Sequence, residues 1–162
     1  MKLVVIMYSN KLICNILKYI DNNINNKITI DELERRFFYN RFYIMKLFKK
    51  EIGLTIVQYI NSIRIYNSIM SIKNKEINLI NIAFKNGFYS LEYFSETFKQ
   101  ITNLNPKTYK DYFNFKKYIS QNIVDSINNT IVKLYEINNI KDIYLSKQKP
   151  NINPVKKLSI FK

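Results

Sequence analysis

Basic and apolar side chains recur at helical spacing between residues 42 and 50. Steps of one, three and four residues place five of them along one side of a predicted helix, namely Phe42, Met45, Lys46, Lys49 and Lys50. Lysines at this spacing can neutralise phosphates, and apolar neighbours can contact thymine methyl groups in a major groove. The alternative interpretation of the lysines is a solvated basic helix face without a ligand.

The residue types that are missing narrow the chemistry further. The 162 residues contain no His and one Cys, which excludes His-based triads, zinc fingers and disulfide frameworks. With only 2 Gly, no Gly-rich phosphate loop can be built. Because no acid pair stands out either, we expect no catalytic residue, no metal site and no cofactor, and an enzyme has little support.

The charge balance points to a polyanionic partner. The chain has 26 Lys and Arg against 12 Asp and Glu, a net charge of +14. Such a domain favours nucleic acid first and an anionic membrane surface second, although its richness in Ile, Asn, Lys and Tyr is also typical of AT-rich genomes. The apolar run 3–8 is far shorter than the roughly 20 residues that span a bilayer and lacks secretory features. We therefore expect a cytoplasmic protein with no membrane partner.

Apolar residues recur at intervals of three and four almost throughout the chain, which predicts an all-α fold. Thr29 and Asn40 are suited to begin helices, because their side chains accept hydrogen bonds from the first turn, and Gly53 is suited to end one. The expected order is a lead over 1–9, a helix over about 10–22, a helix pair over about 29–50, a long helix over about 55–72 and a second pair over about 77–101.

The second helix pair repeats the first. The apolar pattern of 28–33 returns at 77–82, and that of 43–49 returns at 93–99, so the offset is 49 residues in the first helix and 50 in the second. Each unit reads as a short helix, a tight turn and a second short helix, which is the helix-turn-helix plan. A solenoid is disfavoured, because it needs at least about three repeats.

The two turns differ in the residues that form them. In the second unit Ala83 is small where the helices meet, Gly87 tolerates positive φ and Ser90 can cap the next helix. The corresponding first-unit residues are Glu34 and Phe38. Phe38 cannot take positive φ cheaply, so we predict a first turn built differently, with one residue fewer. Gly87→Val should destabilise the domain, and Phe38→Gly should lose aromatic burial if Phe38 packs inward.

At these residues a family resemblance becomes specific. The stretch 82–99, IAFKNGFYSLEYFSETFK, resembles the signature of the AraC/XylS family of bacterial transcription regulators. The segment NPKTYK at 105–110 is similar to the closing element of that family, and 47–53 and 59–64 resemble its first unit and linker helix. The resemblance covers about 10–117. It implies a seven-helix DNA-binding domain in which a long helix joins two helix-turn-helix motifs.

The resemblance implies that two recognition helices enter adjacent major-groove segments on one DNA face. One chain can then supply a two-point grip, so we expect a monomer on double-stranded DNA. Ala83 and Gly87 are expected to be structural turn residues. The residues expected to face DNA are Asn40, Arg41, Phe42, Met45, Lys46, Lys49 and Lys50 in the first unit and Ser90, Leu91, Glu92, Ser95, Glu96, Lys99, Lys107 and Lys110 in the second unit and after it.

We expect a sequence-specific transcription regulator, acting as an activator, with RNA polymerase as a candidate second partner. The alternative is a degenerate helical interaction module that keeps the fold without reading DNA, a hypothesis motivated by Glu34, Phe38 and Glu96. The family often has a basic residue where this chain has Glu96, so base preference cannot be carried over. Arg64 matches a structural position of the family.

Residues 118–162 lie beyond the resemblance. Apolar residues at helical spacing from Ile119 to Leu134 predict one more amphipathic helix, and a loose basic tail follows from Lys147. The extension is open to three interpretations, as the stub of an effector domain, a lid on the DNA-binding domain or a dimerisation helix.

Overall fold

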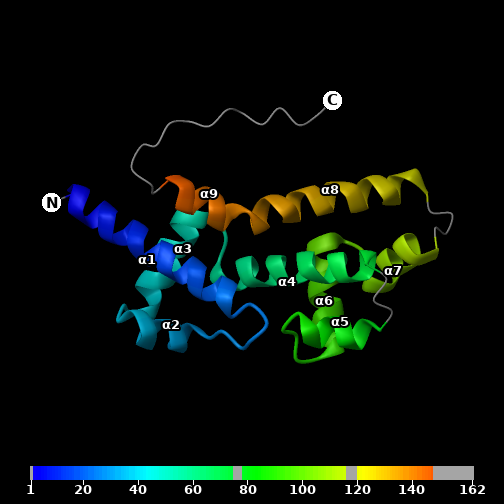
Figure 1. Ribbon diagram of the computed structural model, residues 1–162, viewed down its shortest axis with the longest axis horizontal. Coiled ribbons are helices and arrows are strands. Elements are labelled where there is room, and N and C mark those ends of the chain that lie inside the picture. The colour runs from blue at the N-terminus through cyan, green and yellow to red at the C-terminus, as the bar shows by residue number, and fades with distance from the viewer. Residues whose placement is uncertain (1, 75–77, 116–119, 148–162) are drawn as a thin grey trace.

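The computed structural model describes residues 2–74, 78–115 and 120–147, and all regular elements within them are helices, which confirms the all-α prediction (Figure 1). None of the described helices is long and apolar enough to cross a bilayer. The predicted basic tail lies outside the described residues from 148 onward. In chain order the helices are α1 Lys2–Asn22, α2 Ile30–Phe37, α3 Arg41–Ile52, α4 Ile56–Lys73, α5 Leu79–Lys85, α6 Leu91–Thr102, α7 Pro106–Phe115, α8 Gln121–Asn138 and α9 Ile140–Lys147.

The helix boundaries follow from side-chain caps that the sequence predicted. The side chain of Thr29 accepts a hydrogen bond from the backbone N–H of Glu32 at 3.2 Å and begins α2. Asn40 begins α3 in the same way, and Gly53 ends α3 with a positive φ of 83°. The exception is α1, which begins at Lys2 and not near residue 10. No Gly or Pro in this stretch interrupts it.

The long helix α4 joins two helix-turn-helix units, α2–α3 and α5–α6 (Figure 1). Its first half packs Ile56, Tyr59 and Ile60 into a core shared with α1, α2 and α3. Its second half packs Ile65 and Ile69 into a separate core shared with α5, α6, α7 and α8. Because one helix belongs to both cores, α4 fixes the distance and the orientation between the two units.

The C-terminal extension packs back onto this domain. Helix α8 lies along α4, and α9 lies against α1 (Figure 1). Ile127 and Leu134 of α8 are buried in the core of the second unit. At the other end, the Lys141 ammonium lies 2.6 Å from an Asp21 carboxylate oxygen. Ile137 packs against both cores, so the extension spans the two units as α4 does.

Candidate nucleic-acid interface

The first turn contains an unexpected residue in the left-handed region. Phe38 has φ 59° and ψ 34°, and its backbone N–H donates to the Glu34 carbonyl oxygen at 3.0 Å, which ends α2. Its ring is 92% exposed. The prediction that Phe38 avoids positive φ is therefore wrong, and the condition set for a loss of aromatic burial, that Phe38 packs inward, is not met. The ring meets no core, and the last carbonyls of α2 need a residue in this conformation.

The predicted difference in turn length is confirmed. One residue separates Phe38 from the cap Asn40, whereas two separate Gly87 from the cap Ser90. Counted from the left-handed residue, both turns end with a capping side chain and differ by one inserted residue. At the helix ends they also differ, because Phe38 directly follows α2, whereas Asn86, with φ −97°, lies between α5 and Gly87.

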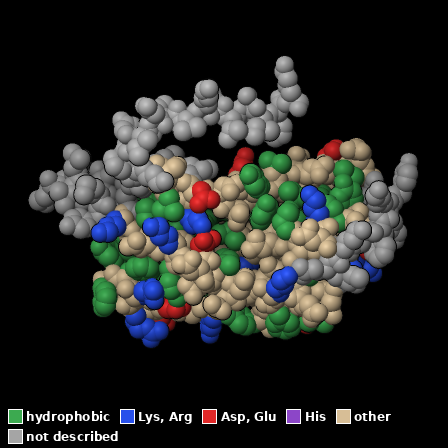
Figure 2. All heavy atoms as spheres, viewed as in Figure 1, with side chains coloured by type: hydrophobic (Ala, Val, Ile, Leu, Met, Phe, Trp, Pro, Cys, Tyr) green, Lys and Arg blue, Asp and Glu red, His purple; other side chains and the backbone are tan. Residues whose placement is uncertain are grey.

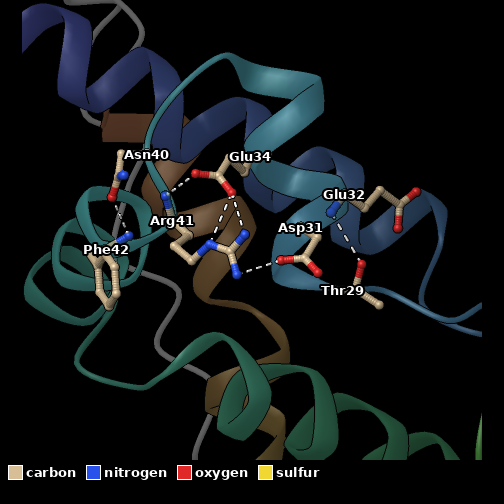
Figure 3. A network of polar contacts seen from close by, with 7 residues as sticks. All are labelled: Thr29, Asp31, Glu32, Glu34, Asn40, Arg41 and Phe42. Atoms are coloured by element: carbon tan, nitrogen blue, oxygen red, sulfur yellow. Dashed lines mark hydrogen bonds and ion pairs between the residues drawn. The ribbon is translucent and has the colours of Figure 1, made fainter.

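A carboxylate–arginine network fastens the first unit (Figure 3). Glu34 accepts hydrogen bonds from the backbone N–H of Arg41 at 3.1 Å and from its Nε at 3.0 Å. The Arg41 Nη1 atom lies 2.9 Å from an Asp31 carboxylate oxygen, and Nη2 lies 2.9 Å from Glu34. The network ties the start of α3 to α2 at the position where the second unit has buried Ala83. Glu34 thus joins the two helices of the first unit through Arg41, where the second unit packs a small residue.

The network gives a structural role to Arg41, which the sequence placed among the DNA contacts. Its backbone N–H and all three guanidinium nitrogens are engaged by carboxylates within the first unit. A sequence signal existed, because Asp31 and Glu34 are three residues apart on one face of α2. The equivalence of Glu34 with the small Ala83 conceals this signal, because the partner of Glu34 lies seven residues further along the chain.

The predicted outward face of α3 is exposed. Phe42 is 70% exposed and extends away from the carboxylate–arginine network (Figure 3), while Met45 and the three lysines also face solvent. Within the described residues Lys46, Lys49 and Lys50 make no ion pair. The Asn40 side chain accepts from the Phe42 N–H at 2.9 Å, so it is committed to capping α3.

This face of α3 also borders an open groove of about 740 Å³ between α3, residues 28–30 and the start of α4. Its walls are mainly apolar, and Lys46, Lys49 and Lys50 stand along it. Figure 2 shows several Lys and Arg side chains at the left, the end of the molecule that holds α1 and the first unit. The first unit therefore offers positive charge beside apolar contact area.

The outward face of α6 has a different charge. Glu92, Glu96 and Lys99 are exposed, and Ser95 is partly exposed, as predicted. Leu91 is half-buried and packs against the second core, so it differs from the prediction. The Ser90 hydroxyl accepts from the Tyr93 N–H at 3.1 Å and caps α6. Beyond this helix, Lys107 is exposed and Lys110 is partly exposed on α7.

An aromatic stack holds α6 from beneath. The ring centroids of Phe88 and Phe94 are 5.2 Å apart, those of Phe94 and Phe98 are 5.6 Å apart, and those of Phe98 and Tyr109 are 5.0 Å apart, all edge to face. These four side chains are buried, and such pairs add to the area that they bury. The stack fixes which side of α6 faces solvent.

Arg64 and Gly87 connect the second turn to the loop between α1 and α2. Gly87 has φ 80°, as predicted, and a Cβ there would lie 2.9 Å from the Ile24 carbonyl oxygen and 3.0 Å from the Arg64 Nε. Arg64 is buried and donates to the backbone oxygens of Ile24 at 2.8 Å and Asn26 at 2.7 Å. Burial lowers the pKa of its guanidinium. Its structural role is confirmed, and the close approach of the 24–26 loop could not be seen in the sequence.

Comparisons with known proteins agree with this arrangement. Residues 33–112 match the model of a helix-turn-helix domain family. The chain is 25% identical over 103 residues to the HTH-type transcriptional activator AarP of Providencia stuartii, an alignment covering 64% of this chain and 76% of that protein. It is 26% identical over 96 residues to the multiple antibiotic resistance protein MarA of Salmonella typhimurium, an alignment covering 59% of this chain and 76% of that protein.

Two solved structures share the fold. A protein of unknown function from Listeria innocua superposes with a TM-score of 0.58 and 29% identity, covering 62% of this chain and 95% of that one. The C-terminal domain of AraT, a response regulator from Geobacillus stearothermophilus, superposes with a TM-score of 0.59 and 20% identity, covering 68% of this chain and 88% of that one.

Proposed function

We propose that this chain, whose residues 33–112 belong to the AraC/XylS family of helix-turn-helix transcription regulators, binds one asymmetric double-stranded DNA site as a monomer. In this proposal α3 and α6 enter adjacent major-groove segments. That the chain is a DNA-binding transcription regulator follows from the family. The proposal that one chain binds with both helices in adjacent groove segments depends on how α3 and α6 are held relative to each other.

The observation that carries the proposal is the exposed face of α3. Three lysines without an ion pair in the described part of the chain stand beside Phe42 and Met45. Lysines there can bind phosphates, and the two apolar side chains can contact thymine methyl groups, which explains why large apolar groups face water.

A monomer is favoured because one chain already holds two recognition helices. The shared helix α4, which belongs to both cores, keeps α3 and α6 in a fixed relation. A dimer is therefore not needed to read two groove segments. Sedimentation of the protein on a single duplex of about two helical turns tests this, and an obligate dimer on a palindrome would contradict it.

We further propose that the regulator is an activator with RNA polymerase as its second partner. The support is the relative AarP, which is named as a transcriptional activator. In vitro transcription from a selected binding site, with and without the protein, tests the direction of regulation. Repression at that site would contradict this part of the proposal and leave DNA binding standing.

The alternative, an interaction module that no longer reads DNA, has lost most of its motivation. Phe38 forms a left-handed helix end at a conformational cost, and Glu34 fastens the first unit through Arg41. Neither residue distorts the motif. Only Glu96 on the outward face of α6 still favours the alternative, because a carboxylate repels phosphates.

The salt dependence of binding tests the proposal. The Arg41 guanidinium is paired with carboxylates of α2, so we count five of the six lysines expected to face DNA as phosphate contacts, and they predict a slope of about −4 to −5 for log affinity against log salt. The five are Lys46, Lys49, Lys50, Lys99 and Lys110.

A pair of variants sharpens this test. Lys49→Ala should weaken binding to all duplexes about equally and reduce the slope by about one. Lys18→Ala is the matched control, because Lys18 is an equally charged, exposed residue on α1, outside both units. A slope near zero, or equal effects of the two variants, would refute the proposed interface.

A further inference from the structure

The two recognition helices carry opposite charge on their outward faces. α3 presents Lys46, Lys49 and Lys50, whereas α6 presents Glu92 and Glu96 with Lys99. Neither glutamate makes an ion pair or a side-chain hydrogen bond within the described residues. The proposed DNA-binding face therefore contains two carboxylates that no contact within this part of the protein explains.

Glu96 is the harder of the two to explain by folding. Glu92 lies in the first turn of α6, where a negative charge is favourable to the helix dipole. Glu96 lies in the middle of the helix, and it is four residues from Glu92, a spacing at which like charges repel. Lys99, three residues further on, attracts it by a similar amount, so the charge of Glu96 contributes little net stability to the helix. In the proposed complex this carboxylate is repelled by the DNA phosphates unless it meets a hydrogen-bond donor.

The fold also determines where Glu96 points. Phe94 and Phe98 flank it by two residues on either side and are fully buried, which places Glu96 on the opposite side of α6. Tyr93 accepts a hydrogen bond from the Asn61 Nδ2 at 3.0 Å, so α6 is also fastened to α4. The helix cannot turn Glu96 away without breaking the aromatic stack beneath it.

We propose that Glu96 is a specificity-determining residue that accepts a hydrogen bond from the N4 amino group of cytosine. The inference rests on the proposed function, in which α6 enters the major groove. On that edge guanine presents acceptors only, thymine presents an acceptor and a methyl group, and adenine presents a donor beside an acceptor. Cytosine alone presents a donor without a neighbouring acceptor. A carboxylate, which only accepts, therefore selects cytosine.

In this assignment the two units contribute differently to affinity and to base selection. The lysines of α3 supply affinity through phosphates, which carry no sequence information, while Phe42 and Met45 are proposed to contact thymine methyl groups. The acidic face of α6 lowers affinity for duplexes in general and restores it where cytosine meets Glu96. Removing the Glu96 charge should therefore have opposite effects on random and on selected DNA.

The test uses the full chain and duplexes selected from a randomised pool. We expect wild type to select cytosine at one position in the segment read by α6, preferred over other bases by about fivefold to a hundredfold. Glu96→Gln should move that preference to adenine, because an amide bonds both N6 and N7 of adenine. Glu96→Ala should lose the preference without a new one. Both variants should bind random duplex more tightly than wild type.

Glu136→Gln provides the matched control. Glu136 is exposed on α8, outside both units, and the substitution removes the same charge. It should leave the selected bases unchanged. The residue at 96 is exposed, so thermal melts should show that all three variants fold as wild type does.

The outcomes separate this inference from the proposed function. If wild type selects a sequence but Glu96→Gln selects the same bases, the assignment of Glu96 is wrong and the regulator function stands. If wild type binds all duplexes equally, sequence-specific reading itself is refuted, and the inference is refuted with it. If Glu136→Gln shifts the bases as Glu96→Gln does, the effect belongs to net charge, which also overturns the assignment.

Discussion

Replacing Phe38 by glycine is expected to stabilise the protein, although it removes a large apolar side chain. Phe38 has φ 59° and ψ 34°, a conformation that costs an L-residue about 1–2 kcal/mol. The residue is 92% exposed, so little burial is lost with its ring. Glycine adopts this conformation without a steric penalty.

The size of the effect follows from two opposing contributions. Relief of the left-handed strain gains about 1–2 kcal/mol, and the greater freedom of glycine in the unfolded chain takes back about 0.4–1 kcal/mol. The net gain is about 1 kcal/mol in the free energy of unfolding. For a chain of 162 residues this raises Tm by about 2–4 °C.

Thermal and urea unfolding, followed by circular dichroism, measure this change. Phe38→Ala is the matched control, because it removes the ring but keeps a Cβ in the left-handed region, and it should leave stability nearly unchanged. Gly53→Ala should show the reverse effect and lose about 1 kcal/mol, since φ is 83° and no atom lies within 4 Å of the added Cβ.

Two results would refute this reasoning. If Phe38→Gly lowers Tm, the exposed ring makes a stabilising contact that outweighs the strain. If Phe38→Ala raises Tm as much as Phe38→Gly does, the gain comes from removing the ring, and the backbone conformation is not the cause.

Three further predictions concern contacts outside this turn. Glu34→Gln should lower the free energy of unfolding by about 1 kcal/mol, and urea titrations should show a smaller loss in 1 M salt, where the partly exposed ion pairs are screened. Leu134→Ala, which opens the core under α8, should cost about 2–5 kcal/mol, whereas Val132→Ala at a 58% exposed position should stay within about 0.5 kcal/mol in the same titration. Burial and the neighbouring Glu51 raise the pKa of Tyr144 from 10.0 to about 12. Because the unfolded chain loses this proton at a lower pH than the folded one, stability should fall between about pH 10 and pH 12. Thermal melts across this range should show a smaller fall for Tyr144→Phe.

The sequence predicted the parts of the fold that depend on local signals. Caps such as Thr29 and Ser90 act within one helical turn, so they could be identified from spacing alone. The burial of Phe94 and Phe98 follows from helical periodicity in the same way. The start of α1 at Lys2 was missed because no capping residue or breaker marks that end of the helix.

The parts that were missed depend on contacts between segments far apart in the chain. The Arg64 guanidinium binds the backbone oxygens of Ile24 and Asn26, about 40 residues away, and no pattern in the sequence specifies that pairing. The packing of α9 on α1, fastened by Lys141 and Asp21, joins the two ends of the domain and is equally invisible in the sequence. Such contacts form only when the packing of all the helices brings these distant segments together.

The two turns show why a glycine is required in one unit and not in the other. Both Phe38 and Gly87 are left-handed, so the backbone conformation alone does not demand glycine. At Gly87 a Cβ would lie 2.9 Å from the Ile24 carbonyl oxygen and 3.0 Å from the Arg64 Nε, both held in place by their mutual hydrogen bond. Phe38 is exposed, so its Cβ costs conformational strain only. Gly87→Ala should therefore cost clearly more than Gly53→Ala, which adds a Cβ in open space, and equal losses in the two melts would show that packing against the 24–26 loop contributes nothing.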